Sequence, residues 1–162
     1  MSEDRIEKRI LLKAAKGRVW RALTDATEFG SWFGMKLEGP FATGTAVRGV
    51  IVPTTVDAEV AKIQKQYQGT PLELLVERME PGTLFSFRWH PYAVQPGVDS
   101  SKEPTTLVAF TLEEKGAATL LTITESGFEK LPASRRAEAF QRNEGGWSKQ
   151  MQMIETYLVR ES

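Results

Sequence analysis

The stretch from Phe140 to Leu158, FQRNEGGWSKQMQMIETYL, constrains the fold more than any other part of the chain. Its apolar residues return at spacings of three, four or seven, which places them along one face of a helix. These residues are Phe140, Trp147, Met151, Ile154 and Leu158. A helix with one apolar face needs a partner surface, so the pattern predicts a long terminal helix packed on a sheet.

Two adjacent glycines, Gly145 and Gly146, interrupt this helical pattern just before Trp147. Each glycine in a helix interior costs about 1 kcal/mol relative to alanine. We therefore expect a compensating role for the pair. Either the helix bends there, or the missing side chains let another backbone or a ligand come close, so that Trp147 can seat against the interior.

Composition limits the classes of protein to consider. A chain of 162 residues with 41% hydrophobic content fits a single domain, residues 1–162, with a substantial core. The 21 basic and 21 acidic residues balance, which argues against nucleic acid and anionic membranes as partners. Cysteine is absent, the first residues are charged, and no run of eighteen apolar residues occurs. These features predict a soluble cytoplasmic protein without a membrane partner.

Hydrophobic periodicity and turn residues give the order of elements. Strands are expected at 5–12, 36–37, 46–52, 72–79, 83–89, 105–114 and 117–126. Two short helices are expected within 18–32, where Thr27 could cap the second, and another within 57–67, capped by Asp57. A loop is expected at 90–104, and Pro132 and Ser134 open the final helix. Strands grouped between helices favour an α+β fold with an antiparallel sheet curved around the last helix.

Motifs of the common enzyme classes are missing from the sequence. There is no GxSxG nucleophile motif, no phosphate-binding GxxxxGK[ST] and no GxGxxG. The single histidine, His90, cannot form a multi-histidine metal site. Ser126 is best explained as a turn residue, since no base can be assigned to it. We predict no catalytic residue, no metal and no cofactor.

Five segments, in order and across nearly the whole chain, resemble bacterial homologues of the C-terminal domain of the heat-shock protein 90 ATPase activator. They are VWRALTDATEFGSWF (19–33), VERMEPGTLFSFRWHP (76–91), TLVAFTLEE (106–114), LTITESGF (121–128) and GGW (145–147). The resemblance implies the helix-grip fold of the START-like superfamily, in which about six or seven antiparallel strands grip the C-terminal helix. It also implies a cavity between the sheet and that helix.

Several side chains are candidates for lining such a cavity, although ordinary core packing explains most of them equally well. The predicted ligand-binding set is Trp32, Phe85, Phe87, Trp89, His90, Trp147 and Met151. His90 could instead form a structural hydrogen bond at the end of its strand. The segments 57–67 and 90–104 are long enough to cover a pocket mouth, or they are simple connections.

Four charged strand residues have no assigned orientation: Arg48, Glu77, Arg88 and Glu125. Solvent-exposed positions are favoured for all four. An inward orientation would require an ion pair or a polar ligand, because burial of an unpaired charge is costly.

Three functions stay open. The leading one is a protein that binds a small apolar or amphipathic molecule between the sheet and the last helix. A cofactor-independent enzyme like the polyketide cyclases is second, with acid-base roles for His90, Glu77 or Glu125. A chaperone-interaction module is third, because the eukaryotic activator carries an additional N-terminal domain for chaperone contact and this sequence begins almost at its first strand. The aromatic and methionine content could also serve a homodimer contact.

Overall fold

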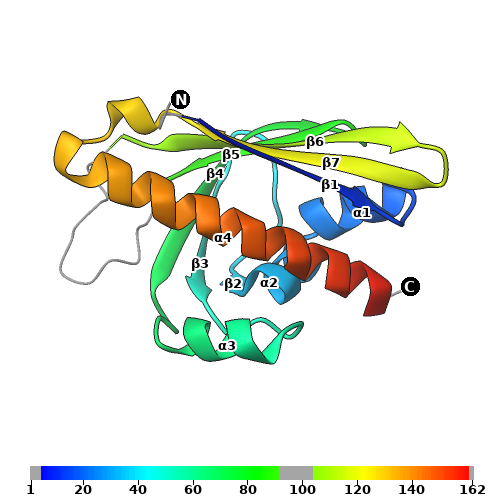
Figure 1. The fold of residues 1–162 in the computed structure, drawn as a ribbon, viewed down its shortest axis with the longest axis horizontal. Coiled ribbons are helices and arrows are strands. Elements are labelled where there is room, and N and C mark those ends of the chain that lie inside the picture. Colours follow the sequence, from blue (N-terminus) through cyan, green and yellow to red (C-terminus); the bar gives the residue numbers. More distant parts are fainter. Residues whose placement is uncertain (1–4, 92–103, 161–162) are drawn as a thin grey trace.

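A seven-stranded antiparallel sheet curves around a long C-terminal helix in the computed structural model, which describes residues 5–91 and 104–160 (Figure 1). The strands are β1 (Arg5–Leu12), β2 (Met35–Leu37), β3 (Ala46–Ile51), β4 (Pro71–Glu80), β5 (Leu84–Trp89), β6 (Thr106–Lys115) and β7 (Ala118–Ser126). Their order in the sheet is β1-β7-β6-β5-β4-β3-β2. The α+β helix-grip fold predicted from the sequence is confirmed.

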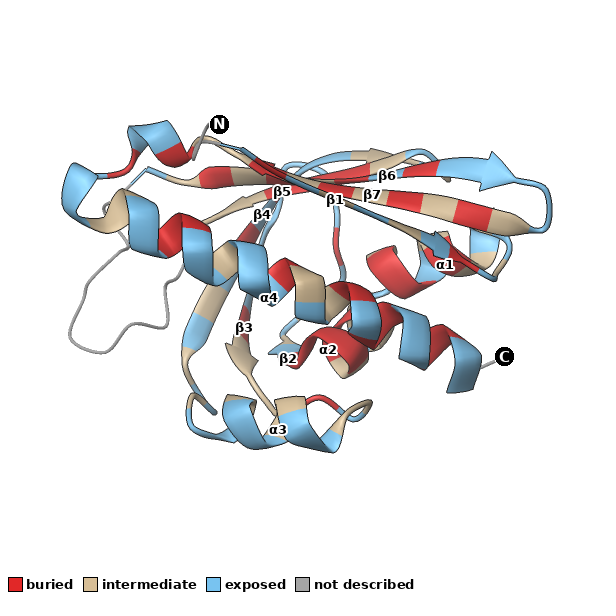
Figure 2. Cartoon of the chain, viewed as in Figure 1, coloured by how far each residue is buried: buried red, intermediate tan, exposed pale blue. Residues whose placement is uncertain are grey.

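Two helices follow β1, one lies in an insertion between β3 and β4, and two close the described chain. They are α1 (Lys16–Thr24), α2 (Ala26–Phe33), α3 (Ala58–Lys65), the 3-10 helix η1 (Phe128–Lys130) and α4 (Ala133–Arg160). Helix α4 runs across the sheet, and Figure 2 shows its buried residues recurring along one side with exposed residues between them. Within residues 5–91 and 104–160, no helix is both long enough and apolar enough to cross a bilayer.

Successive side chains along β6 and β7 point to opposite faces of the sheet, so every second residue lies on the inner face. In β7 the buried positions are Thr119, Leu121, Ile123 and Glu125, and in β6 they are Thr106, Val108, Phe110 and Leu112. Strands β6 and β7 pair with Val108 opposite Glu125. The same period that builds the apolar core therefore carries one carboxyl group and two threonines inward.

Aromatic rings fill most of the space between the sheet and the helices. Phe29, Trp32, Phe85, Phe87 and Phe110 are completely buried, and Phe85 stacks on Phe110 with ring centroids 6.0 Å apart. Burial of each ring contributes about 1.5–3 kcal/mol. The interior beneath α4 is thus largely occupied by side chains of the protein itself.

Glycine is required where α2 turns back toward β2. A Cβ atom on Gly30 would lie 2.1 Å from the carbonyl oxygen of Met35, and Gly34 ends the helix with a φ of 95°. The predicted N-cap of this helix is wrong: Asp25, not Thr27, accepts a hydrogen bond from the Glu28 amide at 3.0 Å. The carboxylate one turn before Glu28 is a stronger cap than the threonine already inside the helix.

Helix α4 continues through Gly145 and Gly146 without a break. Among the described residues, no neighbouring atom lies within 4 Å of the position that a Cβ would take on either glycine, and both glycines are exposed. The expectation that the pair admits a neighbouring backbone is therefore wrong, because their missing side chains point to open space. A bend of the helix and close approach by a ligand are the explanations that remain.

Helix α3 is anchored beside the end of α2. Asp57 caps it, as predicted, by accepting hydrogen bonds from the Glu59 and Val60 amides. The Gln64 side chain donates to the carbonyl oxygen of Phe33 at 2.9 Å and accepts from the Thr54 amide at 2.8 Å. The other segment considered as a pocket cover, 90–104, lies mostly outside the described residues.

Candidate functional site

Glu125 is the one carboxylate among residues 5–91 and 104–160 that is completely buried. It is the penultimate residue of β7, and its side chain points toward α4. The expected outward orientation is wrong for Glu125, because alternation from Leu121 and Ile123 fixes its inward direction. The expectation holds for the other three residues, which form outward pairs: Arg48 with Glu73 at 3.2 Å, and Arg88 with Glu77 at 2.8 Å.

Four neutral side chains donate hydrogen bonds to the Glu125 carboxylate. On Oε2, Trp89 Nε1 lies at 2.8 Å and Thr106 Oγ1 at 2.5 Å. Trp147 Nε1 lies 2.8 Å from Oε1, and Asn143 Nδ2 lies 3.0 Å from both oxygens. The donors come from β5, β6 and α4, so this single carboxylate connects three elements of the fold to β7.

Burial raises the pKa of Glu125 above its ordinary value of 4.5, and the hydrogen bonds from Thr106, Trp89, Trp147 and Asn143 oppose that rise. Desolvation is the larger effect because it penalises only the charged form. Within the described part of the chain, no lysine, arginine or histidine forms an ion pair with this carboxylate. The site therefore contains a proton-binding group whose negative charge is stabilised by neutral donors alone.

A small pocket of about 80 Å³ lies directly beside this carboxylate. It is lined by Phe33, Trp89, Asn143, Gly146, Trp147 and Gln150. The ring centroids of Trp89 and Trp147 are 5.7 Å apart, and each lies 6.0 Å from that of Phe33. Three aromatic walls and two amide side chains thus surround the space, and Gly146 leaves one side of it without a side chain.

Gln150 contributes an amide side chain to the lining of this pocket. Its Nε2 donates to the carbonyl oxygen of Phe33 at 3.0 Å, which orients the amide group. Its Oε1 is buried and has no hydrogen-bond partner among the described residues. A buried amide oxygen without a donor costs about 1–3 kcal/mol.

Comparison with known proteins identifies the family of this chain. A sequence model of the family described as Activator of Hsp90 ATPase homolog 1-like protein matches residues 13–159. The chain belongs to this family. The resemblance stated from five sequence segments is thereby confirmed. A search of curated proteins found no significant match.

Solved structures resemble this member of the activator family over almost its whole length. DynU16, a protein from the dynemicin biosynthetic locus, is 26% identical over 96% of the chain with a TM-score of 0.66; the chain spans only 47% of DynU16. A protein from Mesorhizobium loti is 22% identical, with 98% of each chain covered and a TM-score of 0.71. The Aha1 dimer from Colwellia psychrerythraea is 15% identical, with 93% and 92% covered and a TM-score of 0.65. The last two show the fold alone.

The predicted ligand-binding residues of this family member lie in four different places. Trp89 and Trp147 meet at Glu125 and line the pocket. Phe85, Phe87 and Met151 are buried in the surrounding core. Trp32 lies elsewhere in the core, where its Nε1 donates to the carbonyl oxygen of Ala22 at 2.9 Å. His90 follows Trp89 at the end of β5 and is half-buried.

The sequence reasoning missed Phe33, Thr106, Asn143 and Gln150 as members of the site. Asn143 precedes Trp147 by four residues and Gln150 follows it by three, so Asn143, Trp147 and Gln150 share one helical face. That spacing could have identified the two amides. Thr106 could not be identified in the same way, because a threonine at the start of a strand has many ordinary explanations.

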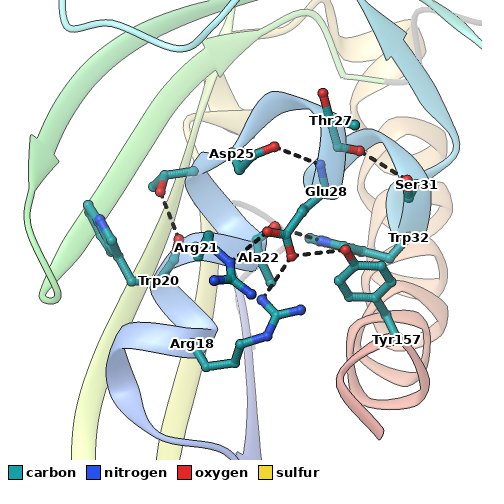
Figure 3. A network of polar contacts seen from close by, with 11 residues as sticks. Arg18, Trp20, Arg21, Ala22, Asp25, Thr27, Glu28, Ser31, Trp32 and Tyr157 are labelled. Carbon is teal, nitrogen blue, oxygen red and sulfur yellow. Dashed lines mark hydrogen bonds and ion pairs between the residues drawn. The ribbon is translucent and has the colours of Figure 1, made fainter. Parts of the chain in front are cut away.

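A second polar cluster lies at the other end of α4, around Glu28 (Figure 3). Its carboxylate pairs with Arg18 and with Arg21, both at 2.8 Å, and accepts a hydrogen bond from the Tyr157 hydroxyl at 2.9 Å. Desolvation, followed by the hydrogen bond to Glu28 and its negative charge, raises the pKa of Tyr157 to about 12. These contacts join α1, α2 and α4, and they give the cluster a structural role.

A wider groove of about 770 Å³ runs along α2 and β2. Hydroxyl groups on its wall bond to the backbone: Ser31 Oγ donates to Thr27 at 3.0 Å, and Thr55 Oγ1 donates to Ser31 at 3.4 Å. These two hydroxyl groups are thus engaged within the protein.

Proposed function

We propose that this protein binds a small amphipathic molecule at the pocket between β5 and α4, beside Glu125. The observation that carries the proposal is the pocket itself, which is walled by three aromatic rings and by the amide side chains of Asn143 and Gln150. Aromatic walls with a few convergent polar groups are typical of small-molecule sites. The ligand-binding residues of the proposal are Phe33, Trp89, Asn143, Trp147 and Gln150.

The size of the pocket determines how the molecule sits. Sites that enclose a drug-sized ligand measure about 300–1,000 Å³, whereas this pocket measures about 80 Å³. Only one end of the ligand enters, and the remainder lies on the exposed surface of α4. Gly146 supplies the room for it, since a side chain there would extend into the open space at the pocket rim. The proposed role of Gly146 is therefore to let a ligand come close, which is one of the roles expected from the sequence.

Native mass spectrometry after mild purification tests the proposal, with a matched pair of variants. Gly146→Leu places a side chain at the pocket, and Gly145→Leu places the same side chain on the adjacent exposed position, which does not line the pocket. We expect a bound mass on the wild type and on Gly145→Leu, and its loss from Gly146→Leu. The same adduct on all three proteins, or none on any, would contradict the proposal.

A cofactor-independent cyclase-like enzyme is the second candidate, and the raised pKa of Glu125 favours it. A carboxyl group whose pKa is raised can exchange protons with a substrate, and because Glu125 is completely buried, that exchange would run through the pocket residues Trp89, Asn143 or Trp147 that bond to it, or would need them to move. Glu77 is a poor candidate for that role because it is exposed and paired with Arg88. Turnover of a linear poly-β-ketone by the wild type, and its loss in Glu125→Gln, is the expected result for this function.

Homodimer formation is proposed because one similar structure, Aha1 from Colwellia psychrerythraea, is a dimer. Light scattering on the purified protein measures its mass in solution. A mass twice that of the 18.1 kDa chain is expected, and a monomer at all concentrations would contradict it.

Chaperone contact is proposed as a third function on the basis of the family description. A pull-down with the middle domain of heat-shock protein 90, followed by an ATPase assay, tests it separately from ligand binding. Retention of this chain together with faster ATP hydrolysis is expected for a chaperone partner, and failure of both excludes the role.

A further inference from the structure

We propose that the outer face of β5, β6 and β7 binds the same face of a second copy of this chain. This inference rests on the proposed homodimer and names the surface that forms it. It follows from the side chains on that face, from the order of charges across the sheet and from the curvature of the sheet.

The outer face of these three strands carries a patch without charged side chains. Figure 1 shows α1, α2 and α4 together on the inner side of the strands, so none of these helices covers the outer side. Alternation places nine residues there: Leu84, Ser86, Leu107, Ala109, Thr111, Leu120, Thr122, Thr124 and Ser126. None of them is charged, although 26% of the chain is. Depletion of charge is typical of the centre of a protein–protein interface.

Strand pairing sets these residues in rows that cross the sheet and end in charges. One row runs from Glu7 in β1 through Thr124, Ala109 and Ser86 to Arg78 in β4. The next row runs from Arg9 in β1 through Thr122, Thr111 and Leu84 to Glu80 in β4. The two rows therefore end in opposite charges on both sides of the patch.

The charges at each row end are neighbours along one strand. Glu7 pairs with Arg9 at 2.9 Å, and Arg78 pairs with Glu80. All four side chains are exposed to solvent, by 39% to 64%. A guanidinium group has five N–H donors, so each arginine retains donors for a second carboxylate.

A two-fold axis that crosses the strands between the two rows matches these charges with a second copy. It places Glu7 opposite the partner's Arg9, and Arg78 opposite the partner's Glu80. Each row end then holds four charges of alternating sign, and such a network contributes more than an isolated exposed pair. An axis along β6 would instead place Glu113 opposite its own copy, which like-charge repulsion disfavours.

The curvature of the sheet fits the same arrangement. The sheet curves around α4, so its outer face is convex and two copies come closest along the middle strands (Figure 1). Ala109 and Ser86 lie in this middle region and are small, and Ser86 is itself buried between its neighbours. The arginine and glutamate side chains at the row ends are long enough to span the wider gap there. Helix α4 and the ligand pocket stay on the inner side and remain accessible.

Sedimentation velocity over a dilution series tests the inference with two charge-reversal variants. Glu7→Arg brings two bases opposite each other across the axis, and Arg9→Glu brings two acids opposite each other. We expect the dissociation constant of each variant to rise at least tenfold over that of the wild type. An equimolar mixture of the two variants restores opposite charges across the axis. It should dimerise with a dissociation constant within about threefold of the wild-type value.

Two further variants serve as controls. Arg48→Glu breaks an exposed pair of the same kind, with Glu73 at 3.2 Å, on β3 and outside the two rows. It should leave the dissociation constant unchanged. Ala109→Arg places a long charged side chain where the two copies come closest and changes no row end. It should raise the dissociation constant at least tenfold, which keeps the inference testable if a β1 variant folds poorly.

The outcomes separate this inference from the homodimer on which it rests. A wild type that stays a monomer at all concentrations contradicts both. A wild-type dimer with variants that dimerise equally well shows that the dimer uses another surface. Weakened single variants whose mixture does not dimerise show that Glu7 does not face the partner's Arg9, and they overturn the arrangement. Weakened single variants whose mixture dimerises support it.

Discussion

Trp147 Nε1 donates a hydrogen bond to Glu125 Oε1 across 2.8 Å, and this contact joins α4 to β7 in the interior of the protein. The same carboxylate also binds Trp89 from β5 and Thr106 from β6. A buried carboxylate in this position is costly to desolvate. In this protein, donors from β5, β6 and α4 offset that cost. Glu125 therefore positions α4 on the sheet and also lies next to the proposed ligand site.

Trp147→Phe removes the donor and keeps an aromatic ring. We expect the free energy of unfolding to fall by about 1.5–3 kcal/mol beyond the effect of ring size, because the lost bond is to a charged acceptor. Trp32→Phe is the control: Trp32 is equally buried but donates to the neutral carbonyl of Ala22, a bond worth about 0.5–1.5 kcal/mol. Urea unfolding measures both variants. Equal losses, or a larger loss at Trp32, would show that the carboxylate contact is not the stronger one.

The pH dependence of stability should reveal the raised pKa of Glu125. The folded protein holds this proton more tightly than the unfolded chain does, so the contribution of Glu125 to stability is fully present below the ordinary pKa of 4.5. It is lost as pH rises from 4.5 through the higher pKa of the folded state. The unfolding free energies of the wild type and Glu125→Gln should be measured in parallel. As pH rises, the wild type should lose stability relative to Glu125→Gln. A difference between the two proteins that does not change with pH, or a wild type that gains stability relative to the variant, would contradict the prediction.

The fold could be predicted from the sequence almost completely, because strand alternation, helical spacing and turn residues all indicate the same architecture. The helix Phe140–Leu158 and the inward row Phe85, Phe87 and Trp89 are examples, since each depends only on local periodicity. The candidate site could be predicted only in part. Trp89 and Trp147 were expected to face the interior, whereas Glu125 was placed outside because a solvated glutamate is the ordinary case.

The inward position of Glu125 depends on partners far away in the sequence. Asn143 and Trp147 follow it by 18 and 22 residues, and Trp89 precedes it by 36. A local pattern reports which face of a strand a residue occupies but not whether four donors will meet it there. The size of the pocket is likewise a result of side-chain packing, which periodicity does not contain.

Gly145→Ala should stabilise the protein by about 0.5–1 kcal/mol, because alanine is the better helix former and its methyl group meets no neighbouring atom of residues 5–91 and 104–160 within 4 Å. Gly30→Ala is the opposing control, since its methyl group would lie 2.1 Å from the Met35 carbonyl oxygen. We expect that variant to lose stability. Thermal unfolding of both proteins measures the difference. Destabilisation by Gly145→Ala would show that the helix needs a glycine there for its own conformation.

Glu28→Gln should lower the pKa of Tyr157 from about 12 toward the ordinary value of 10.0. The glutamine keeps a hydrogen-bond acceptor but removes the negative charge that disfavours the phenolate. Ultraviolet titration of tyrosine ionisation measures the change, and the Tyr157→Phe protein identifies which step of the titration belongs to Tyr157. A pKa that stays near 12 in Glu28→Gln would assign the shift to burial alone.

The indole N–H resonances of the four tryptophans, followed by NMR as pH is raised, test the central role of Glu125 most directly. Trp89 and Trp147 donate to the carboxylate, whereas Trp32 donates to a backbone carbonyl, so these residues report different acceptors. We predict that the Trp89 and Trp147 resonances shift together with one midpoint above 4.5, that Trp20 and Trp32 do not follow them, and that Glu125→Gln abolishes the shift. Indole resonances of Trp89 and Trp147 that titrate separately, or that do not respond to pH, would contradict a shared buried carboxylate at this site.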